Sequence, residues 1–339
     1  MPPSTRLDLT PRACEVCHGK DGLLRCSGCQ SVYYCGRDHQ LSDRGGHKEG
    51  CVAVKKALAL LTREEHKLRN LPEDMWTPAN VFDTSVGQFW RIVETRPYMR
   101  ARFGLVDVLL QYFGSAGGRV HVVQAALDHL LDMLRLCRSD NMGLRNLHPG
   151  LAAYDFLKWY ATTGQDSHYD WGDMSLPFLD VKDADVLEPE HGLWSGRFLD
   201  LSHAVTVTLL KVRVLLDLQA VQNATRTLRG TVPPEIIDLV HHRLVGSVVE
   251  SRPEMLRGTT DRIEPLKKQV RELFTAIDKY NTSFWRSMLC NPAKAIADRP
   301  ESYSHGSYEE SCLMLGYTYA AWAETPGAID VIRALSNKS

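Results

Sequence analysis

The sequence predicts a small N-terminal module held together by bonds between side chains and metal ions, followed by an all-α region. Two observations carry this prediction. Six of the nine cysteines lie between Cys14 and Cys51, in pairs with the spacing of metal ligands. From residue 52 onward, apolar residues recur at intervals of three and four, and the alternation typical of strands is almost absent.

Composition and charge narrow the function classes. Residues 1–13 are expected to form an N-terminal tail, and they contain no apolar run like that of a signal peptide. No window approaches the roughly 20 apolar residues that a membrane-spanning helix needs. The formal net charge of −1 gives the chain no overall attraction to phosphate backbones. We therefore expect an intracellular protein, nuclear or cytoplasmic, that binds neither membranes nor nucleic acid directly.

The clustered ligands form four consecutive pairs, namely Cys14-x2-Cys17, Cys26-x2-Cys29, Cys35-x3-His39 and His47-x3-Cys51. A two-residue gap lets both thiolates turn toward one ion, and a three-residue gap places two ligands one helical turn apart. Eight ligands, at four per tetrahedral ion, predict two Zn²⁺ per chain. The odd number of cysteines and the missing secretory signal argue against disulfides. Spacing alone leaves open whether the two sites are interleaved or sequential.

Residues 14–51 resemble a MYND-type zinc finger. The features that carry the resemblance are the knuckle spacing, the Cys-Ser-Gly-Cys sequence, Tyr33-Tyr34-Cys35-Gly36, Gln40 and His47-Lys48-x2-Cys51. The resemblance implies a cross-brace, in which the ligand pairs alternate between the two ions. The first zinc would then take Cys14, Cys17, Cys35 and His39, and the second would take Cys26, Cys29, His47 and Cys51. His39 stands where the family usually has cysteine, and imidazole is an acceptable zinc ligand.

The same resemblance implies partners. MYND fingers resemble other cross-brace modules in that they bind proteins. We therefore expect the partners to be other proteins, bound through peptide segments. One mode in the family binds proline-rich peptides through a serine, a glutamine and a tryptophan. Ser27 and Gln40 match the first two, but Arg44 stands at the position of the tryptophan. Because a guanidinium does not replace the flat apolar wall of an indole, a proline-rich ligand is not favoured.

The remaining chain is expected to be helical. Val54, Leu58, Leu61 and Leu68 predict a helix after the finger, so residues 52–79 are interpreted as a connecting helix and linker. Residues 80–339 are interpreted as one α-helical domain. Helices are expected at 85–95, 98–113, 119–138, 151–162, 197–223, 233–250, 262–289, 308–323 and 326–337. Residues 164–195 are acidic and irregular, and their aromatic side chains suggest that this segment is tethered to the helices.

Two patterns in this region have alternative interpretations. The small and large positions of a tetratricopeptide repeat are matched by Cys312, Leu315, Gly316, Tyr319, Ala328 and Ile332. A repeat-like architecture is favoured over an irregular helical domain. The heptad stripe from Ile263 to Phe284 fits a coiled coil, but a helix packed inside the array is favoured. Residues 80–339 also resemble a helical region of uncharacterised fungal MYND-containing proteins, which implies no activity.

The sequence lacks the fingerprints of common enzyme classes. It has no phosphate loop, no Gly-x-Gly-x2-Gly, no Gly-x-Ser-x-Gly and no His-Glu-x2-His. The resemblance includes some MYND proteins that are lysine methyltransferases with a SET domain. The Asn-His dipeptide in a turn of that domain is missing from this sequence. We therefore expect a non-enzymatic scaffold protein that binds other proteins. Transcriptional regulation is one candidate process for such a protein. The alternative is a divergent MYND-linked methyltransferase.

Overall fold

The computed structural model describes residues 12–337 except for 74–76, 115–118, 145–152, 183, 191, 197–198, 228–243, 246–247, 249–251 and 253–258. The chain divides into two compact units. The first, here called the finger unit, comprises Met1–Leu144 and Asp170–Ser175. The second, the helical unit, comprises Arg145–Tyr169 and Leu176–Ser339.

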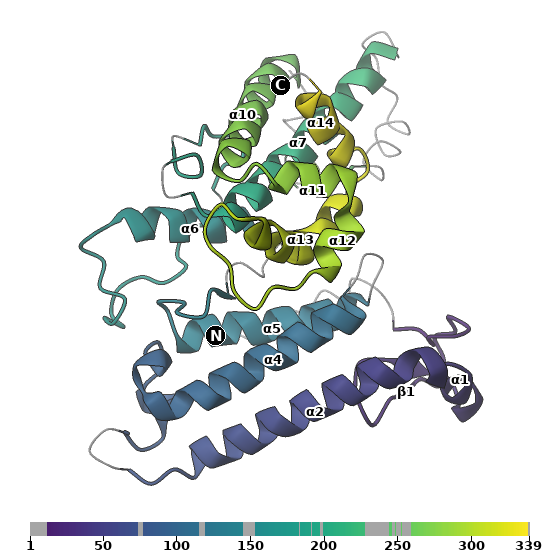
Figure 1. The fold of residues 1–339 in the computed structure, drawn as a ribbon, viewed down its shortest axis with the longest axis vertical. Coiled ribbons are helices and arrows are strands. Elements are labelled where there is room, and N and C mark those ends of the chain that lie inside the picture. Colours follow the sequence, from purple (N-terminus) through teal and green to yellow (C-terminus); the bar gives the residue numbers. More distant parts are fainter. Residues whose placement is uncertain are drawn as a thin grey trace. The chain divides into compact units, whose positions relative to one another are not determined.

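The finger unit combines a two-stranded sheet with three long helices that lie side by side (Figure 1). Its elements are β1 (Leu24–Arg25), β2 (Tyr33–Tyr34), α1 (Arg37–Ser42), α2 (Arg44–Arg69), α3 (Val81–Thr84), the 3₁₀ turns η1 (Phe89–Arg91) and η2 (Val93–Thr95), α4 (Arg96–Phe113) and α5 (Val120–Leu136). The strands are antiparallel, with Leu24 opposite Tyr34. α4 packs between α2 and α5, so the three helices form one layer.

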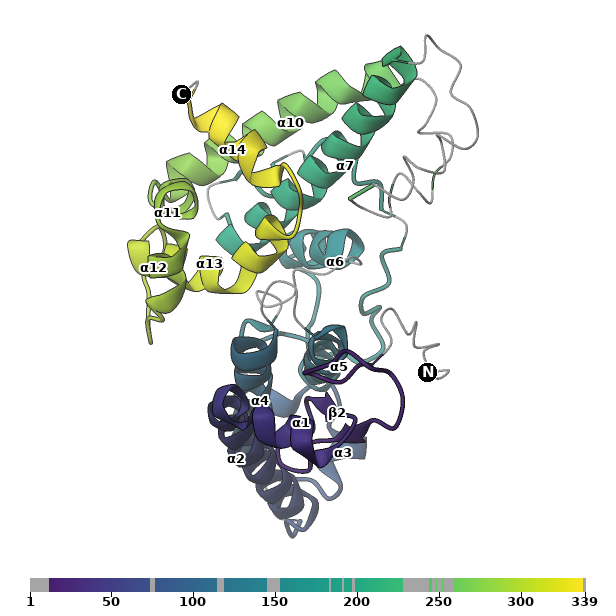
Figure 2. The same cartoon turned by 90° about the vertical axis from the view of Figure 1, so that its right-hand side faces the viewer.

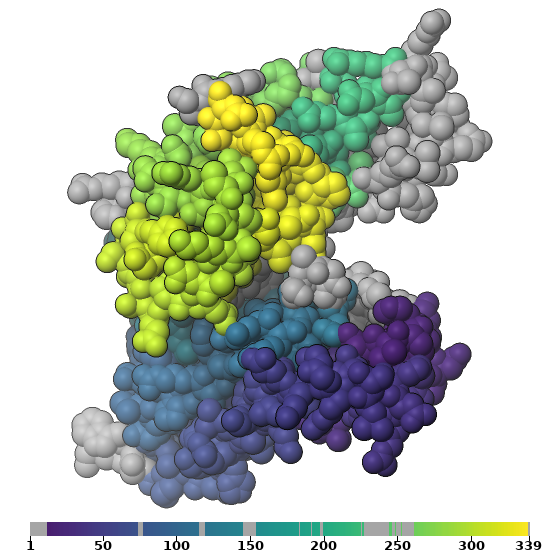
Figure 3. All heavy atoms as spheres, turned by 45° about the vertical axis from the view of Figure 1, so that its right-hand side comes forward, coloured from purple at the N-terminus to yellow at the C-terminus, as the bar shows by residue number. Residues whose placement is uncertain are grey.

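The helix α2 belongs both to the finger and to the helical layer. It begins at Arg44, inside the cysteine-rich segment, and continues for 26 residues. Its buried face carries His47 and Cys51 near one end and Leu61 and Leu68 toward the other. In the space-filling view of Figure 3, the purple residues of the finger are continuous with the blue surface of α2. The predicted helix after residue 52 therefore starts eight residues earlier than expected.

Gly50 allows α2 to approach α4 closely. A Cβ at this position would lie 3.0 Å from Cβ of Tyr112 and 3.1 Å from Cζ of Phe113. Both neighbours are held by the packing of α4, so a larger side chain has no free space to enter. The close approach explains a glycine in a helix interior, where glycine costs about 1 kcal/mol relative to alanine.

We expect Gly50→Leu to destabilise the finger unit by at least about 2 kcal/mol, because the added side chain would force α4 away. Gly45→Leu is the matched control, since nothing lies within 4 Å of a Cβ at Gly45 on the same helix. Chemical denaturation of the zinc-loaded variants measures the difference. Equal stability of the two variants would show that α4 does not press on α2 at Gly50.

In the helical unit, the other helices surround one buried helix (Figure 2). Its elements are α6 (Ala153–Gln165), α7 (Leu201–Thr227), α10 (Thr259–Tyr280), α11 (Phe284–Cys290), α12 (Pro292–Ala297), α13 (Tyr308–Ala323) and α14 (Ala328–Ser336). The helix α7 contacts α6, α10, α13 and α14. Because neighbours cover α7 on several sides, nearly every residue from Leu201 to Leu218 is buried, polar ones included. A helix that is apolar on all sides is typical of such a central position.

The all-α class is confirmed, and several predicted helices closely match observed ones. Those expected at 98–113, 119–138 and 308–323 correspond to α4, α5 and α13. The helix expected at 85–95 is wrong, because this stretch forms two 3₁₀ turns. Gly87 has a φ of +89°, and Gln88 forms a β-bridge with Cys137, so a continuous helix cannot form there. Most of the helix expected at 233–250 lies outside the described residues.

The helix expected at 262–289 is divided in two. α10 ends at Tyr280, and Asn281 accepts a hydrogen bond from the Ser283 backbone in the turn before α11. The stripe residues Ile263 to Ile277 are buried within the unit, where α10 packs on α7. The stripe is therefore a packing face inside the helical array, which is the interpretation that the sequence favoured.

The tetratricopeptide-like repeat is not confirmed. The helices α13 and α14 follow one another in a hairpin, but they differ in length, with 16 and nine residues. The neighbours α11 and α12 are shorter still. The domain boundaries expected at residues 13, 51 and 79 stay predictions.

The acidic segment is tethered to α6 through aromatic contacts, as its composition suggested. The ring of Trp159 packs edge-on against Tyr169 and Phe178, and its Nε1 donates to the carboxylate of Asp180 at 3.0 Å. Farther along, Trp194 is buried against Tyr154. The segment is irregular in backbone but anchored at both ends.

Candidate metal centre

Two tight knuckles present the first four cysteines. In each knuckle, the residue after the second cysteine donates its backbone N–H to the carbonyl of the first cysteine at 2.9 Å. These residues are His18 and Gln30, and both have positive φ, +57° and +55°. The left-handed conformation closes each turn and leaves the two Sγ atoms on one side. The knuckles of Cys14 and Cys26 are thus built alike, although they serve different sites.

Helices and the strand β2 present the other ligands. Cys35 directly follows β2, and His39 lies in the short helix α1. His47 and Cys51 lie one turn apart on the buried face of α2, as the three-residue gap predicts. Ligands that are 25 residues apart in sequence are brought together in this way, Cys14 with His39 and Cys26 with Cys51.

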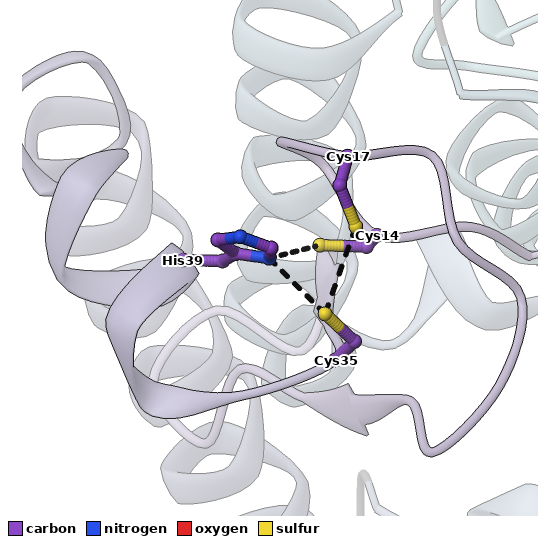
Figure 4. A group of neighbouring side chains, drawn as sticks. All are labelled: Cys14, Cys17, Cys35 and His39. Carbon is purple, nitrogen blue, oxygen red and sulfur yellow. Dashed lines mark hydrogen bonds between the residues drawn. The ribbon is translucent and has the colours of Figure 1, made fainter.

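The first tetrad consists of Cys14, Cys17, Cys35 and His39, whose ligand atoms all lie within 4.8 Å of one another (Figure 4). Nδ1 of His39 lies 3.4 Å from Sγ of Cys14 and 3.1 Å from Sγ of Cys35. The Sγ atoms of Cys17 and Cys35 are 3.7 Å apart. Cys14 is fully buried, whereas Cys17 and Cys35 are exposed.

The second tetrad consists of Cys26, Cys29, His47 and Cys51, and all four residues are buried. Nε2 of His47 lies 3.4 Å from Sγ of Cys26 and 3.6 Å from Sγ of Cys29. The Sγ atoms of Cys26 and Cys51 are 3.8 Å apart. The two histidines therefore present different ring nitrogens, Nδ1 in the first tetrad and Nε2 in the second.

These distances fit zinc. With Zn–S bonds of about 2.3 Å and Zn–N bonds of about 2.05 Å, a tetrahedron has S···S edges of about 3.8 Å and S···N edges of about 3.6 Å. Two of the S···S edges are 3.7 and 3.8 Å, and of the four S···N distances given above, three are between 3.4 and 3.6 Å. The ligand grouping is that of the cross-brace, and a sequential arrangement is excluded. Each tetrad can hold one Zn²⁺, and no ligand position is left open.

The electrostatics of the thiols agree with a cation at each site. Burial opposes ionisation of Cys14, but hydrogen bonds from backbone N–H groups lower the pKa of its thiol to about 5. In the second tetrad, burial and the charge of neighbouring thiolates raise the pKa of Cys29 to about 12. Hydrogen bonds and the charge of Cys14 and Cys17 likewise raise the pKa of Cys35, to about 11. Three thiolates in one tetrad therefore need a dication to offset their repulsion.

Several residues around the second tetrad were not anticipated from the sequence. The backbone N–H of Ser31 donates to Sγ of Cys29 at 3.4 Å. A Cβ at Gly28 would lie 2.9 Å from Sγ of Cys51, so this position has no room for a larger side chain. The ring of Phe113, from α4, packs 6.0 Å from the ring of His47. Only Gly28 had a signal in the sequence, namely its place between two ligands.

The fold and the two closed tetrads define a zinc-stabilised cross-brace module. Residues 14–51 match the family model of the MYND finger, and this part of the chain is a MYND finger. Egl nine homolog 1 of Homo sapiens is 44% identical over 45 residues, which is 13% of this chain and 11% of that protein. Rho GTPase-activating protein gacZ of Dictyostelium discoideum is 32% identical over 77 residues, 22% of this chain and 7% of that protein. No solved structure matches the chain.

The chain thus spans about a tenth or less of the length of these curated relatives. The similarity is local and concerns a module, so it carries no activity of either protein to this chain. Within the described residues, no helix is long and apolar enough to cross a membrane.

Proposed function

We propose that this protein is a non-enzymatic scaffold that binds peptide segments of other proteins through its zinc-stabilised finger. The observation that carries the proposal is the closed ligand set of both tetrads. A catalytic zinc keeps one position for water or substrate, whereas four protein ligands make a structural site. The ions would stabilise the fold, and function would belong to the surface that the fold displays.

The finger displays apolar side chains that its own small core does not use. Leu24 of β1 is 67% exposed, Leu41 of α1 is 59% exposed and Val16 is 41% exposed. Contiguous exposed apolar patches mark protein-binding surfaces, and we propose that these three side chains contribute to such a surface. Ser27 and Arg44 are exposed and Gln40 is half-buried, but the indole of the proline-binding mode is replaced. We therefore propose peptide partners without a requirement for proline.

We expect Leu41→Asp to abolish capture of partner proteins while both zinc ions are retained, because a carboxylate disrupts an apolar contact without touching a ligand. Val93→Asp is the matched control, since Val93 is also 59% exposed and lies outside the finger on η2. Affinity purification with quantitative mass spectrometry compares the two variants. A partner set that is unchanged by Leu41→Asp would place binding on another surface.

The alternative function, a divergent methyltransferase, makes a different prediction. Such an enzyme must bind S-adenosylmethionine, whereas a scaffold has no site for it. Titration calorimetry with S-adenosylmethionine is expected to show no saturable heat. Stoichiometric binding would favour the methyltransferase, and we expect the partner capture described above to be independent of this cofactor.

A further inference from the structure

A pocket of about 160 Å³ lies inside the finger unit, between the second knuckle and the three long helices. Its floor is apolar, formed by Val54 and Leu58 of α2, Leu105 and Leu109 of α4, and Val122 of α5. All of these except Leu58 are buried. An apolar cavity of about 150 Å³ holds a molecule of the size of benzene. The pocket therefore has room for one bulky aliphatic or aromatic side chain.

The end of the pocket at the knuckle is positively charged. Arg25 lines it, and the guanidinium of Arg25 lies 6.0 Å from the ring centroid of Tyr33. Arg12 lies on the same ring at 5.3 Å. Both arginines are exposed, and neither forms an ion pair with another described residue. Tyr33 packs edge-on against His121, which lines the pocket, so two cations without an ion-pair partner stand at this end of the pocket.

The histidines of the lining offer defined hydrogen-bonding groups. Nε2 of His121 donates to the carbonyl of Ser31 at 2.8 Å, because a carbonyl can only accept. Nδ1 of His121 is therefore free to accept a hydrogen bond in the neutral ring. Arg102 donates its Nε–H to Nδ1 of His129 at 3.1 Å, so Nε2 of His129 carries the proton. Among the described residues, no other hydrogen bond involves the ring of His129.

The end of the pocket near His129 differs in charge. Arg102 and Arg135 are both paired there with Asp132, and Asp128 lies on the same helix next to His129. The two arginines and the two carboxylates at this end therefore offset one another. An acidic ligand group would be attracted to the end at Arg25 and not to the end at His129, which gives the pocket a direction.

We propose that this pocket binds a peptide segment of a partner protein that presents one bulky apolar side chain with a carboxylate directly beside it. The apolar side chain enters the floor, the carboxylate faces Arg25, and the N–H of His129 donates to a backbone carbonyl of the peptide. The proposal rests on the proposed protein-binding function and deepens it. It places the site on the joint between finger and helices, with a lining that does not include Ser27, Gln40 or Arg44, so the finger alone lacks the site.

Three short peptides, acetylated and amidated, test the proposal on the zinc-loaded full chain. They are Asp-Asp-Leu-Gly-Gly, Lys-Lys-Leu-Gly-Gly and Asp-Asp-Ala-Gly-Gly. We expect the first to shift the NMR ring signals of His121 and His129, and the other two to bind at least tenfold more weakly. Equal binding of the acidic and basic leucine peptides would overturn the charge assignment, and equal binding of the leucine and alanine peptides would overturn the apolar anchor.

Substitutions in the pocket provide the second arm. Ala125→Leu fills the pocket and should weaken binding of the acidic leucine peptide at least tenfold, whereas Ala125→Ser keeps its volume and serves as the control. Arg25→Gln should weaken binding about fivefold to tenfold, while Arg37→Gln on α1 should have no effect. Zinc content and circular dichroism show whether each variant is folded. Unchanged binding by folded Ala125→Leu overturns the pocket as the site.

The outcomes of this test are separable from those of the proposed function. If the peptides fail to bind but partner capture still depends on Leu41, the pocket is overturned and the scaffold function stands. If neither the peptides nor any partner depends on the finger unit, both proposals fall. The peptide comparison uses the unsubstituted protein, so it holds even where a variant does not fold.

Discussion

Replacing Cys14 by serine and replacing His39 by alanine should each release the same zinc ion, although 25 residues separate them in sequence. Each change opens one tetrahedron, and a structural zinc contributes binding free energy on the order of 10 kcal/mol. Each single variant should therefore retain one zinc per chain instead of two. The pair Cys26→Ser and Cys51→Ser should act in the same way on the other ion.

The double variants decide the grouping. Cys14→Ser combined with His39→Ala should still retain one zinc, because the first ion is already lost in either single variant. Cys14→Ser combined with Cys26→Ser should retain none. Cys290→Ser is the matched control, since Cys290 is exposed and lies outside both tetrads. Elemental analysis measures the content, and one retained zinc in the combination of Cys14→Ser with Cys26→Ser would contradict the cross-brace.

Replacing the buried Lys211 by methionine should destabilise the helical unit, by about 2 kcal/mol at pH 7.5. Nζ of Lys211 donates to the carbonyls of Val186 and Glu188, at 2.7 and 2.9 Å, and to Oε1 of Gln269 at 2.7 Å. The side chain is fully buried and joins α7, α10 and the segment before α7. Methionine would fill the space but leave these acceptors unpaired, and an unpaired buried acceptor costs about 1–3 kcal/mol.

The effect of this substitution should grow with pH. Burial lowers the pKa of Lys211 to about 8, although nearby carboxylates oppose the shift. In the unfolded chain, the pKa of a lysine is about 10.4. Between these values the unfolded state binds the additional proton, so the stability of the unsubstituted protein rises with pH relative to a variant without this lysine. The difference should increase by about 2 kcal/mol from pH 7.5 to 9.5.

Urea denaturation followed by circular dichroism, at both pH values, measures this difference. Lys268→Met is the control, because Lys268 is an exposed residue on α10 whose ion pair with Glu272 contributes little. We expect it to change stability by less than about 0.5 kcal/mol. A penalty for Lys211→Met that is the same at pH 7.5 and 9.5 would show that Lys211 is not held in a strongly desolvated environment.

The ligands could be recognised from sequence because metal chemistry restricts both residue type and spacing. Cys26 and Cys29 had to face one ion, and the gap between His47 and Cys51 indicated one helical turn. The interleaving followed from the family resemblance, since local spacing carries no information about which pairs meet in space. The helix expected at 308–323 matches α13, whose first turn is capped by the side chain of Ser307.

The features that were predicted wrongly or missed also have a physical reason. The stretch around Phe89 has apolar periodicity, but the left-handed Gly87 and a bridge to Cys137 impose a different backbone. The role of Lys211 could not be predicted, because two of its three partners are backbone carbonyl oxygens of a distant segment, which any residue supplies. The pocket beside His121 could not be predicted either, since it depends on how α2, α4 and α5 approach the knuckle.

The continuity of α2 has a consequence for how tightly the metal is held. A peptide cut at Cys51 would keep only residues 44–51 of this helix, too few to be helical in water on their own. Such a peptide must order His47 and Cys51 at the moment of binding, whereas the full chain holds both in place by packing α2 on α4. The full chain should therefore bind its second zinc more tightly than the excised finger does. Binding of the ion and packing of α2 on α4 are thermodynamically linked. The bound ion therefore stabilises the helical layer by the same difference in free energy.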